Sequence, residues 1–403
     1  RHFLPDDIVL RAFNEEVTDR YFVKQERKEA NNFKLFFSHG DKQLPVIRGL
    51  NFDEKNAFVV EPSARLDTIT YWLRDTTLVN QDTLSIAMTY RTTDTLGTLV
   101  TQCDTLQLLA KRPYARRQKD AAKEYEDWHK KQEKKRKRGQ PYDSIMPPKS
   151  LQMRINTQST IEPDRDIIFS FDRPIAIADT SKIHLYAKQD SLWYDTPLRV
   201  RPVSERIPGD TTRAAILSLR NYELRAEWQP DTEYSLELDS MAFVDIYGLV
   251  TPPIKQGIKV QSLDEYSSLI FTLSKQGDTH FVVELLNQQG DPVKRTTAID
   301  GTAQFYYITP GKYYARMFAD DNNNGVWDTG DYAAGLQPEM MYYYPDEIEC
   351  KAKWDVTLDW NPTARPLDKQ KPAKITKQKA EKQRKIRQRN IERARKMGIA
   401  YPF

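Results

Sequence analysis

The stretch TLSIAMTY, from Thr83 to Tyr90, determines the fold class expected for this chain. Its apolar residues Leu84, Ile86 and Met88 alternate with small or polar residues. Successive side chains of a β-strand point to opposite faces of the sheet, whereas a helix would need apolar residues three and four positions apart. The alternation therefore predicts a strand with one buried face.

Similar short runs occupy the chain on both sides of this stretch, separated by Asn, Asp, Gly, Pro and Ser. Between Asp6 and Leu109 they are IVLRAF, NFKLFFS, PVIRGLNF, AFVVEP, TITYWL and TLQLLA. Between Leu151 and Ser262 they are DIIFSF, KIHLYAK, LRVRPV, RAAILSL, YSLELDS and IKQGIKV, and a third set lies between Tyr266 and Trp360. Short β-branched and aromatic runs at turn-separated spacing are typical of sandwiches. The sequence predicts an all-β protein with three sandwich domains, at residues 1–110, 150–262 and 263–360.

Two strongly basic segments interrupt and follow these domains. Lys111 to Arg138 contains 13 Lys and Arg against 5 Asp and Glu, and Asn361 to Phe403 contains 14 against 3. Their net charges of +8 and +11 leave −15 for the rest of a chain whose total is +4. We therefore expect an acidic body with two basic appendages: an insertion and linker at residues 111–149, and a partly helical tail at residues 361–403.

The first basic segment is predicted to be a long helix from Tyr114 to Arg138. It consists of good helix formers between Pro113 and Gly139, where a helix C-terminal glycine belongs. About 25 residues at 1.5 Å each would form a rod of roughly 37 Å. A short apolar stripe that includes Tyr125 and Trp128 could dock one end of this rod on its domain.

The distal half of the helix has nothing apolar to bury and should project into solvent. We predict that it contacts a partner of the protein, and that the contact involves Lys134, Lys135, Arg136 and Lys137. The tail, helix-forming from Thr376 to Met397, is expected to order by docking on the acidic body or on a partner.

Three stretches in the second and third domains carry a family resemblance. DIIFSFDRPIAIADTSKI (166–183), WQPDTEYSLEL (228–238) and DIYG (245–248) resemble the SbsA-type bacterial immunoglobulin-like domain. AIDGTAQFYYITPGKYYARMF (298–318) resembles the transthyretin-like or carboxypeptidase-regulatory type of β-sandwich. In its arrangement the whole chain resembles the immunoglobulin-like-domain lipoproteins of Bacteroidota.

This resemblance implies a location and a role. It implies a lipid-anchored protein at the outer membrane, on its periplasmic or its cell-surface side, although the lipidated cysteine usual in that family is not in this chain. It implies a non-catalytic scaffold or accessory subunit of a cell-envelope complex. The partner would be an integral β-barrel or an assembly or transport machinery.

The stretch DDNNNGVWDTGDY, residues 320–332, has the spacing of a calcium loop. With Gly325 at position 6, oxygen ligands fall at positions 1, 3, 5, 7, 9 and 12. These are the side chains of Asp320, Asn322, Asn324, Asp328 and Asp331, with the backbone carbonyl of Val326 at position 7. A bound calcium ion would be structural. The alternative is a metal-free turn in which Asn and Asp side chains cap backbone N–H groups.

The sequence contains none of the motifs that mark common active sites. G-x-S-x-G, the P-loop, G-x-G-x-x-G and H-E-x-x-H are all missing, Cys103 and Cys350 lie far apart, and the five histidines occur singly. We therefore expect a protein that is not an enzyme and has no catalytic residues. The basic segments lack the interleaved aromatics of a nucleic-acid-binding surface, so no nucleic-acid partner is expected.

A glycan-binding surface protein is the alternative function. Aromatic residues make up 11% of the chain, and Tyr342, Tyr343 and Tyr344 are consecutive. Exposed aromatic rings can stack on sugars. In a strand, however, at least every second side chain of such a run must face inward, which favours core packing for much of it.

Overall fold

The computed structural model describes residues 19–157, 159–206, 215–274, 279–332, 334–376 and 393–398. Among the described residues, those from 19 to 261 and those from 262 onward belong to two compact units, and each unit is described by itself. The strand expected in IVLRAF and most of the helix expected in the tail lie outside the described residues. No helix among the described residues is long and apolar enough to cross a membrane.

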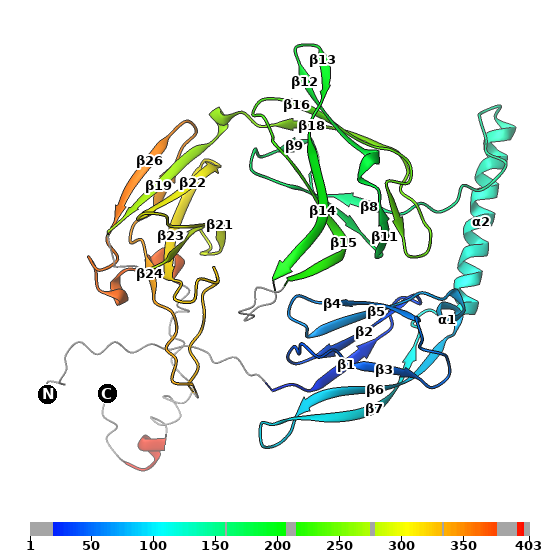
Figure 1. Cartoon of the computed structure of the whole chain (residues 1–403), viewed down its shortest axis with the longest axis horizontal. Helices are drawn as coiled ribbons and strands as arrows, with labels where there is room; N and C mark the ends of the chain where they lie inside the picture. Colours follow the sequence, from blue (N-terminus) through cyan, green and yellow to red (C-terminus); the bar gives the residue numbers. More distant parts are fainter. Residues whose placement is uncertain are drawn as a thin grey trace. The chain divides into compact units, whose positions relative to one another are not determined.

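The first unit begins with a β-sandwich (Figure 1). One sheet has the order β1-β2-β5-β4 and the other β3-β6-β7, and all neighbouring strands are antiparallel. The elements are β1 (Phe22–Glu26), β2 (Asn32–Phe37), β3 (Val46–Gly49), β4 (Phe58–Pro62), β5 (Thr68–Leu73), α1 (Thr76–Asn80), β6 (Thr83–Thr93) and β7 (Leu99–Leu109).

The core of this sandwich confirms the alternation in TLSIAMTY. Leu84, Ile86 and Met88 of β6 are fully buried, and they pack against apolar residues of the facing sheet such as Phe33 and Ile69. The strand is longer than the quoted stretch because it continues to Thr93 in a hairpin with β7.

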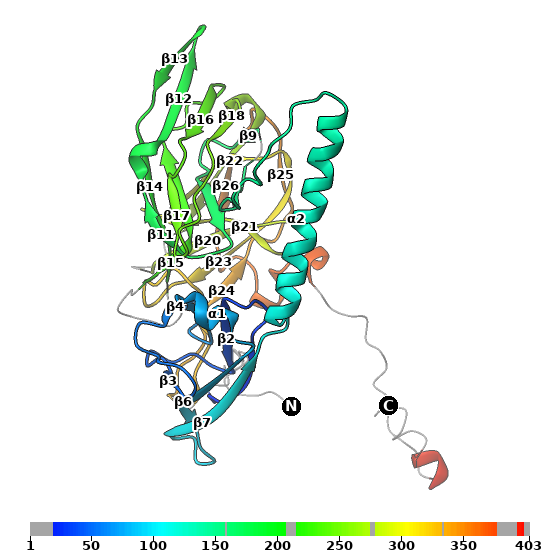
Figure 2. The ribbon, with the colours of Figure 1, turned by 90° about the vertical axis from the view of Figure 1, so that its right-hand side faces the viewer.

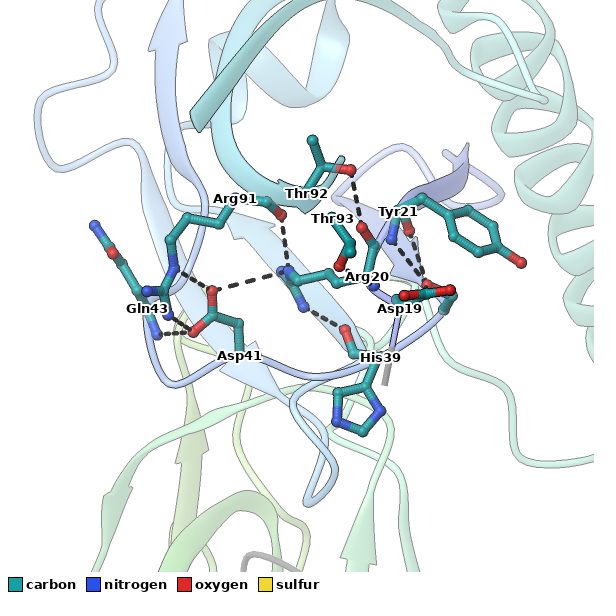
Figure 3. Close-up of polar contacts among 10 residues, drawn as sticks. Asp19, Arg20, Tyr21, His39, Asp41, Gln43, Arg91, Thr92 and Thr93 are labelled. Carbon is teal, nitrogen blue, oxygen red and sulfur yellow. Dashed lines mark hydrogen bonds and ion pairs between the residues drawn. The ribbon is translucent and has the colours of Figure 1, made fainter. Parts of the chain in front are cut away.

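A buried ion-pair network supports the same sandwich (Figure 3). Arg20, 2% exposed, donates from Nε to the carbonyl of Arg91 at 3.0 Å and from Nη1 to the carbonyl of His39. Its Nε lies 3.9 Å from the carboxylate of Asp41, which also accepts two hydrogen bonds from the guanidinium of Arg91. The network joins the chain before β1 to the loop after β2 and to the end of β6.

Helix α2 (Tyr114–Lys137) follows the first sandwich and confirms the predicted helix. Gly139 adopts a φ of 65° just beyond it, and the N–H groups of Gly139 and Gln140 donate to carbonyls of the last turn. Glycine ends the helix because its missing Cβ permits this left-handed conformation.

The second sandwich completes the first unit. Its larger sheets have the orders β14-β15-β10-β8 and β13-β12-β16-β18-β9, with β9 parallel to β18, and β11 pairs with β17. The elements are β8 (Met153–Ile155), β9 (Thr160–Ile161), β10 (Ile167–Phe171), β11 (Ile175–Ala178), η1 (Thr180–Lys182), β12 (Ile183–Gln189), β13 (Leu192–Asp195), β14 (Leu198–Arg206), β15 (Ala215–Ala226), β16 (Glu233–Leu238), β17 (Phe243–Asp245) and β18 (Ile254–Val260).

The second unit is a sandwich with a covered outer face. Its sheets are β22-β19-β26, with β26 parallel to β19, and β21-β20-β23-β24, with β25 also paired to β23. The elements are η2 (Leu263–Glu265), β19 (Ser267–Leu273), β20 (Phe281–Leu286), β21 (Pro292–Thr297), β22 (Thr302–Ile308), β23 (Gly311–Ala319), β24 (Met341–Tyr343), β25 (Ile348–Cys350), β26 (Asp355–Trp360), η3 (Leu367–Lys369) and η4 (Ala373–Ile375).

The start of the basic tail covers the outer face of this second unit. Ile375, 4% exposed, packs against Leu286 and Tyr314, with Tyr343 beside them. Gln370 is also buried: it accepts a hydrogen bond from the backbone of Tyr343 and donates to two backbone carbonyls of the tail. The part of the tail that holds Gln370 and Ile375 is therefore packed on its own sandwich.

Taken together, these units form an all-β fold of tandem immunoglobulin-like sandwiches with a long helix inserted after the first.

Candidate functional site

Side chains that could act as nucleophiles or metal ligands are dispersed over the described part of the chain. Cys103 is exposed and Cys350 is buried, so the two are not equivalent thiols. Burial raises the pKa of the Cys350 thiol, which disfavours its reactive thiolate form. No three His, Cys, Asp or Glu side chains among the described residues are arranged to hold a metal ion.

Polar contacts, and not the expected aromatic stripe, hold the base of α2. The backbone N–H of Tyr114 donates to the carboxylate of Asp82 at 2.6 Å, and Arg117 donates to the carbonyl of Val79 at 2.8 Å. Tyr125 remains 53% exposed and contacts Trp128 of its own helix, with ring centroids 5.9 Å apart. Figure 2 shows α2 as one long, uninterrupted helix.

The segment after α2 runs back along one side of the helix. Gln132, the one buried residue of α2, accepts a hydrogen bond from the backbone of Asp143. The Arg136 guanidinium lies 6.0 Å from the centre of the Tyr142 ring, and Lys149 forms an ion pair with Glu124 at 2.9 Å. This returning segment gives the helix a covered side and an open side.

The four cations predicted to contact a partner are all exposed in the last turn of α2. They are Lys134, Lys135, Arg136 and Lys137. Cations at a helix C-terminus interact favourably with the helix dipole. The structure therefore places the four as expected, and their contact with a partner stays a prediction.

The acidic loop brings four of its six predicted ligands together. The Asp320 carboxylate, 2% exposed as a residue, accepts from the backbone N–H groups of Asn324 and Gly325 at 2.9 and 2.7 Å. The side-chain amides of Asn322 and Asn324 both donate to the carboxylate of Asp328. In this form both amides present hydrogens, and not oxygens, to the Asp328 carboxylate.

The remaining two predicted ligands are placed differently. Val326 donates its N–H to the side-chain oxygen of Asn324, and its side chain is 54% exposed. Asp331 starts a further turn, in which it pairs with Leu336 and its carboxylate accepts from the N–H of Ala334. Asp331 is thus engaged in its own turn.

Glu339, which was not among the predicted residues, closes the loop. It is 8% exposed, and its carboxylate accepts from the backbone N–H groups of Asp321 and Asp328 at 3.0 and 2.9 Å. Burial raises the pKa of Glu339, and the charges of Asp328 and Asp320 raise it further. The nearby charges of Asp320 and Asp328 therefore disfavour the charged form of Glu339.

Calcium binding to this loop requires the amides of Asn322 and Asn324 to turn their oxygens inward, and the predicted calcium loop implies a Kd of about 10⁻⁴ to 10⁻³ M, as in extracellular calcium modules. Calcium at roughly ten times the Kd then adds about 1.4 kcal/mol of stability. Titration calorimetry and thermal melting of EDTA-treated protein measure both effects. Glu339→Gln should lose them and Asp321→Asn, at an exposed neighbour, should keep them. A parent protein that gives neither heat nor a higher Tm with calcium would establish the metal-free turn.

An exposed apolar hairpin is the feature that sequence reasoning missed. Strand β13 forms the edge of its five-stranded sheet, and its residues Leu192, Trp193 and Tyr194 are 63%, 49% and 48% exposed. The hairpin with β12 extends beyond the rest of the sheet in Figures 1 and 2. The run SLWYD, apolar at three consecutive positions between polar residues, was the available signal.

Comparisons with known proteins do not identify a family. No protein-family model and no curated protein matches the chain. Among solved structures, the Bacillus anthracis TIE protein is 10% identical over 86% of this chain, which spans 59% of that one, with a TM-score of 0.16. Escherichia coli alpha-2-macroglobulin is 10% identical over 74% of this chain and 91% of that chain, with a TM-score of 0.21. Tandem immunoglobulin domains of titin are 8% identical over 61% of this chain and 98% of that chain, with a TM-score of 0.17.

Proposed function

We propose that this protein is a non-catalytic scaffold or accessory subunit of a cell-envelope complex, lipid-anchored at the outer membrane. The observation that carries the scaffold role is the exposed edge strand β13. The envelope location and the lipid anchor rest on the resemblance of the chain to the immunoglobulin-like-domain lipoproteins.

The edge of β13 offers both backbone and side-chain contacts. Thr196 donates its N–H to the carbonyl of Leu185. Because residues of an antiparallel pair alternate between bonded and non-bonded positions, Trp193 and Asp195 direct their backbone groups away from β12. An extended segment of a partner protein can pair with these groups. Trp and Tyr are also the residue types that most often supply binding energy at interfaces.

The two sandwiches of the first unit contact each other, and these contacts support the proposed scaffold role. Arg220 of the second sandwich donates to the carboxylate of Glu61 in the first at 2.8 Å, and its guanidinium lies 5.6 Å from the ring centre of Trp72. The hydroxyl of Tyr247 donates to the carbonyl of Asn31 at 3.2 Å. These contacts would hold the hairpin and the helix at a defined spacing, as a scaffold requires.

The same hairpin supports the glycan-binding alternative less well. In the register of β12 and β13, Trp193 lies opposite Lys188 and Tyr194 opposite Ala187, so the two rings are on opposite faces of the strand. The face of a sugar ring would therefore meet one aromatic side chain and not a platform of two. In the tyrosine run, Tyr342 and Tyr344 pack against the core.

The test is purification of the full chain and its partners from detergent-solubilised native membranes. With Trp193→Ser and Tyr194→Ser together we expect partner recovery to fall at least tenfold, about 1.4 kcal/mol or more, because the apolar edge contact is lost. The matched control is Tyr21→Ser with Leu96→Ser, which removes two exposed apolar side chains from the first sandwich. Equal recovery with both variants would refute the hairpin contact. Retention on polysaccharide, lost in the hairpin variant, would instead support glycan binding.

A further inference from the structure

One face of α2 carries a basic stripe along nearly its whole length. Its members are spaced three, four or seven residues apart, so they share one side of the helix. All are exposed: Arg116, Lys119, Lys123, Lys130, Lys134 and Lys137. The 24 residues of α2 give the stripe a length of about 36 Å.

The stripe lies opposite the covered side of the helix. Gln132 and Arg136, which contact the returning segment, are two positions from Lys134, and this spacing turns them by about 160 to 200° from it. Two of the four cations in the last turn, Lys134 and Lys137, belong to the open face. The stripe is therefore the part of α2 that remains free to meet another surface.

One member of the stripe forms an ion pair within the described residues. Lys130 lies 3.8 Å from the carboxylate of Glu126, and both side chains are about two-thirds exposed. The other five members of the stripe form no ion pair in the described part of the chain. Four carboxylates lie three or four residues from members of the stripe and interrupt its positive charge: Asp120, Glu126, Asp127 and Glu133.

We propose that the outer face of α2 lies on a membrane surface and binds the phosphate groups of anionic lipid headgroups. The inference deepens the proposed function, since it assigns the lipid surface as the partner of this helix and leaves the protein partner to the hairpin. Five of the six cations are lysines, whose flexible and strongly hydrated ammonium groups suit diffuse attraction to a charged surface.

The composition of the stripe favours a lipid surface over an acidic protein or a nucleic acid as its partner. It has no aromatic residue and one arginine, so it lacks the anchors of a specific protein interface. The four interspersed carboxylates would repel the closely spaced phosphates of a nucleic acid. A bilayer that mixes phosphate with ammonium headgroups accommodates both signs of charge.

The experiment is co-sedimentation of the full chain with vesicles of phosphatidylcholine, with and without roughly one third phosphatidylglycerol. We expect binding to the anionic vesicles that weakens as salt is raised, and little binding to the neutral ones. Changing Lys123, Lys130, Lys134 and Lys137 to Glu should weaken binding at least tenfold. The same four changed to Gln, a good helix former, should give an intermediate loss, and circular dichroism verifies that the helix persists.

A matched control carries the same change of charge elsewhere in the unit. It reverses four exposed cations of the two sandwiches: Arg48→Glu, Lys55→Glu, Arg65→Glu and Arg199→Glu. The inference requires this control to bind anionic vesicles better than the stripe variant. Equal binding by the two, or tighter binding of the parent chain to duplex DNA or polyglutamate than to the vesicles, would overturn it.

The experiments distinguish failure of the proposed protein contact at the hairpin from failure of the proposed lipid contact at α2. The hairpin variant should bind vesicles like the parent chain, and the stripe variant should recover the protein partner from detergent like the parent chain. If the stripe variant loses the protein partner in detergent while it keeps vesicle binding, the helix contacts protein and the lipid assignment is wrong.

Discussion

Replacement of Asp41 by Asn is expected to lower the free energy of unfolding by about 3 to 5 kcal/mol, because it leaves a buried guanidinium without its counter-charge. The Asp41 side chain is 5% exposed and that of Arg20 is 2% exposed. Asn can replace part of the hydrogen bonding of the carboxylate but none of its charge. Urea unfolding of the full chain, followed by tryptophan fluorescence, to which Trp72 of this sandwich contributes, measures the loss.

The same variant should also lose a pH dependence. Burial alone would raise the pKa of Asp41, but hydrogen bonds from Arg91 and from the Gln43 backbone, with the charges of Arg91 and Arg20, hold it below its ordinary value. A carboxyl whose pKa is lowered by folding stabilises the protein above its unfolded pKa, about 3.9, and this contribution is lost as pH falls through the folded pKa. The parent should therefore lose stability below about pH 4 more steeply than the variant.

Asp53→Asn is the matched control for this network. Asp53 is exposed and its carboxylate accepts a backbone hydrogen bond from Lys55, which Asn can also accept. We expect little change in either measurement with this control. An Asp41→Asn variant as stable as the control, with an acid transition like that of the parent, would show that the ion pairs around Arg20 contribute nothing net.

Replacement of Glu284 by Gln should cost about 2 to 4 kcal/mol in the second unit. Glu284 is 1% exposed in the middle of β20 and receives hydrogen bonds from Arg295 and Arg316. The two arginine side chains are 45% and 24% exposed, so water offsets part of the lost attraction and the estimate is below that for a fully buried triad. Thermal and urea unfolding give the size of the loss.

The change at Glu284 should also loosen the acidic loop. Arg295 donates from Nη1 to the carbonyl of Gly325 at 2.8 Å, so Glu284 positions a side chain that holds the loop. Faster hydrogen exchange at residues 320–328 is expected. Glu347→Gln is the control, because Glu347 also pairs with two cations, Lys312 and Lys374, on the surface. A loss no larger than in that control would mean that burial adds nothing to this ion pair.

Local sequence patterns determined the strands, the helix and its end. Burial of Leu84, Ile86 and Met88 follows from a period of two residues, which is a property of the extended backbone itself. The end of α2 follows from Gly139, because a left-handed residue there needs no contact with the rest of the chain. Such features depend on neighbours within a few residues and could be predicted without a tertiary structure.

The candidate sites depended on neighbours that are distant along the chain. Glu339 reaches the acidic loop from 19 positions beyond Asp320, although the calcium-loop spacing predicted Asp331 in the closing position. The apolar run of β13 could have been a core strand, and its place at a sheet edge leaves it exposed.

The sequence by itself determined which segments are strands and helix and where charge accumulates, because these follow from backbone periodicity and composition. Tertiary structure alone decided that Asp41 meets Arg20 and Arg91, and that one face of α2 is covered while the other is open. The physical reason is that polar pairing and burial are set by the path of the whole chain. That path brings together residues whose separation in sequence carries no periodic signal.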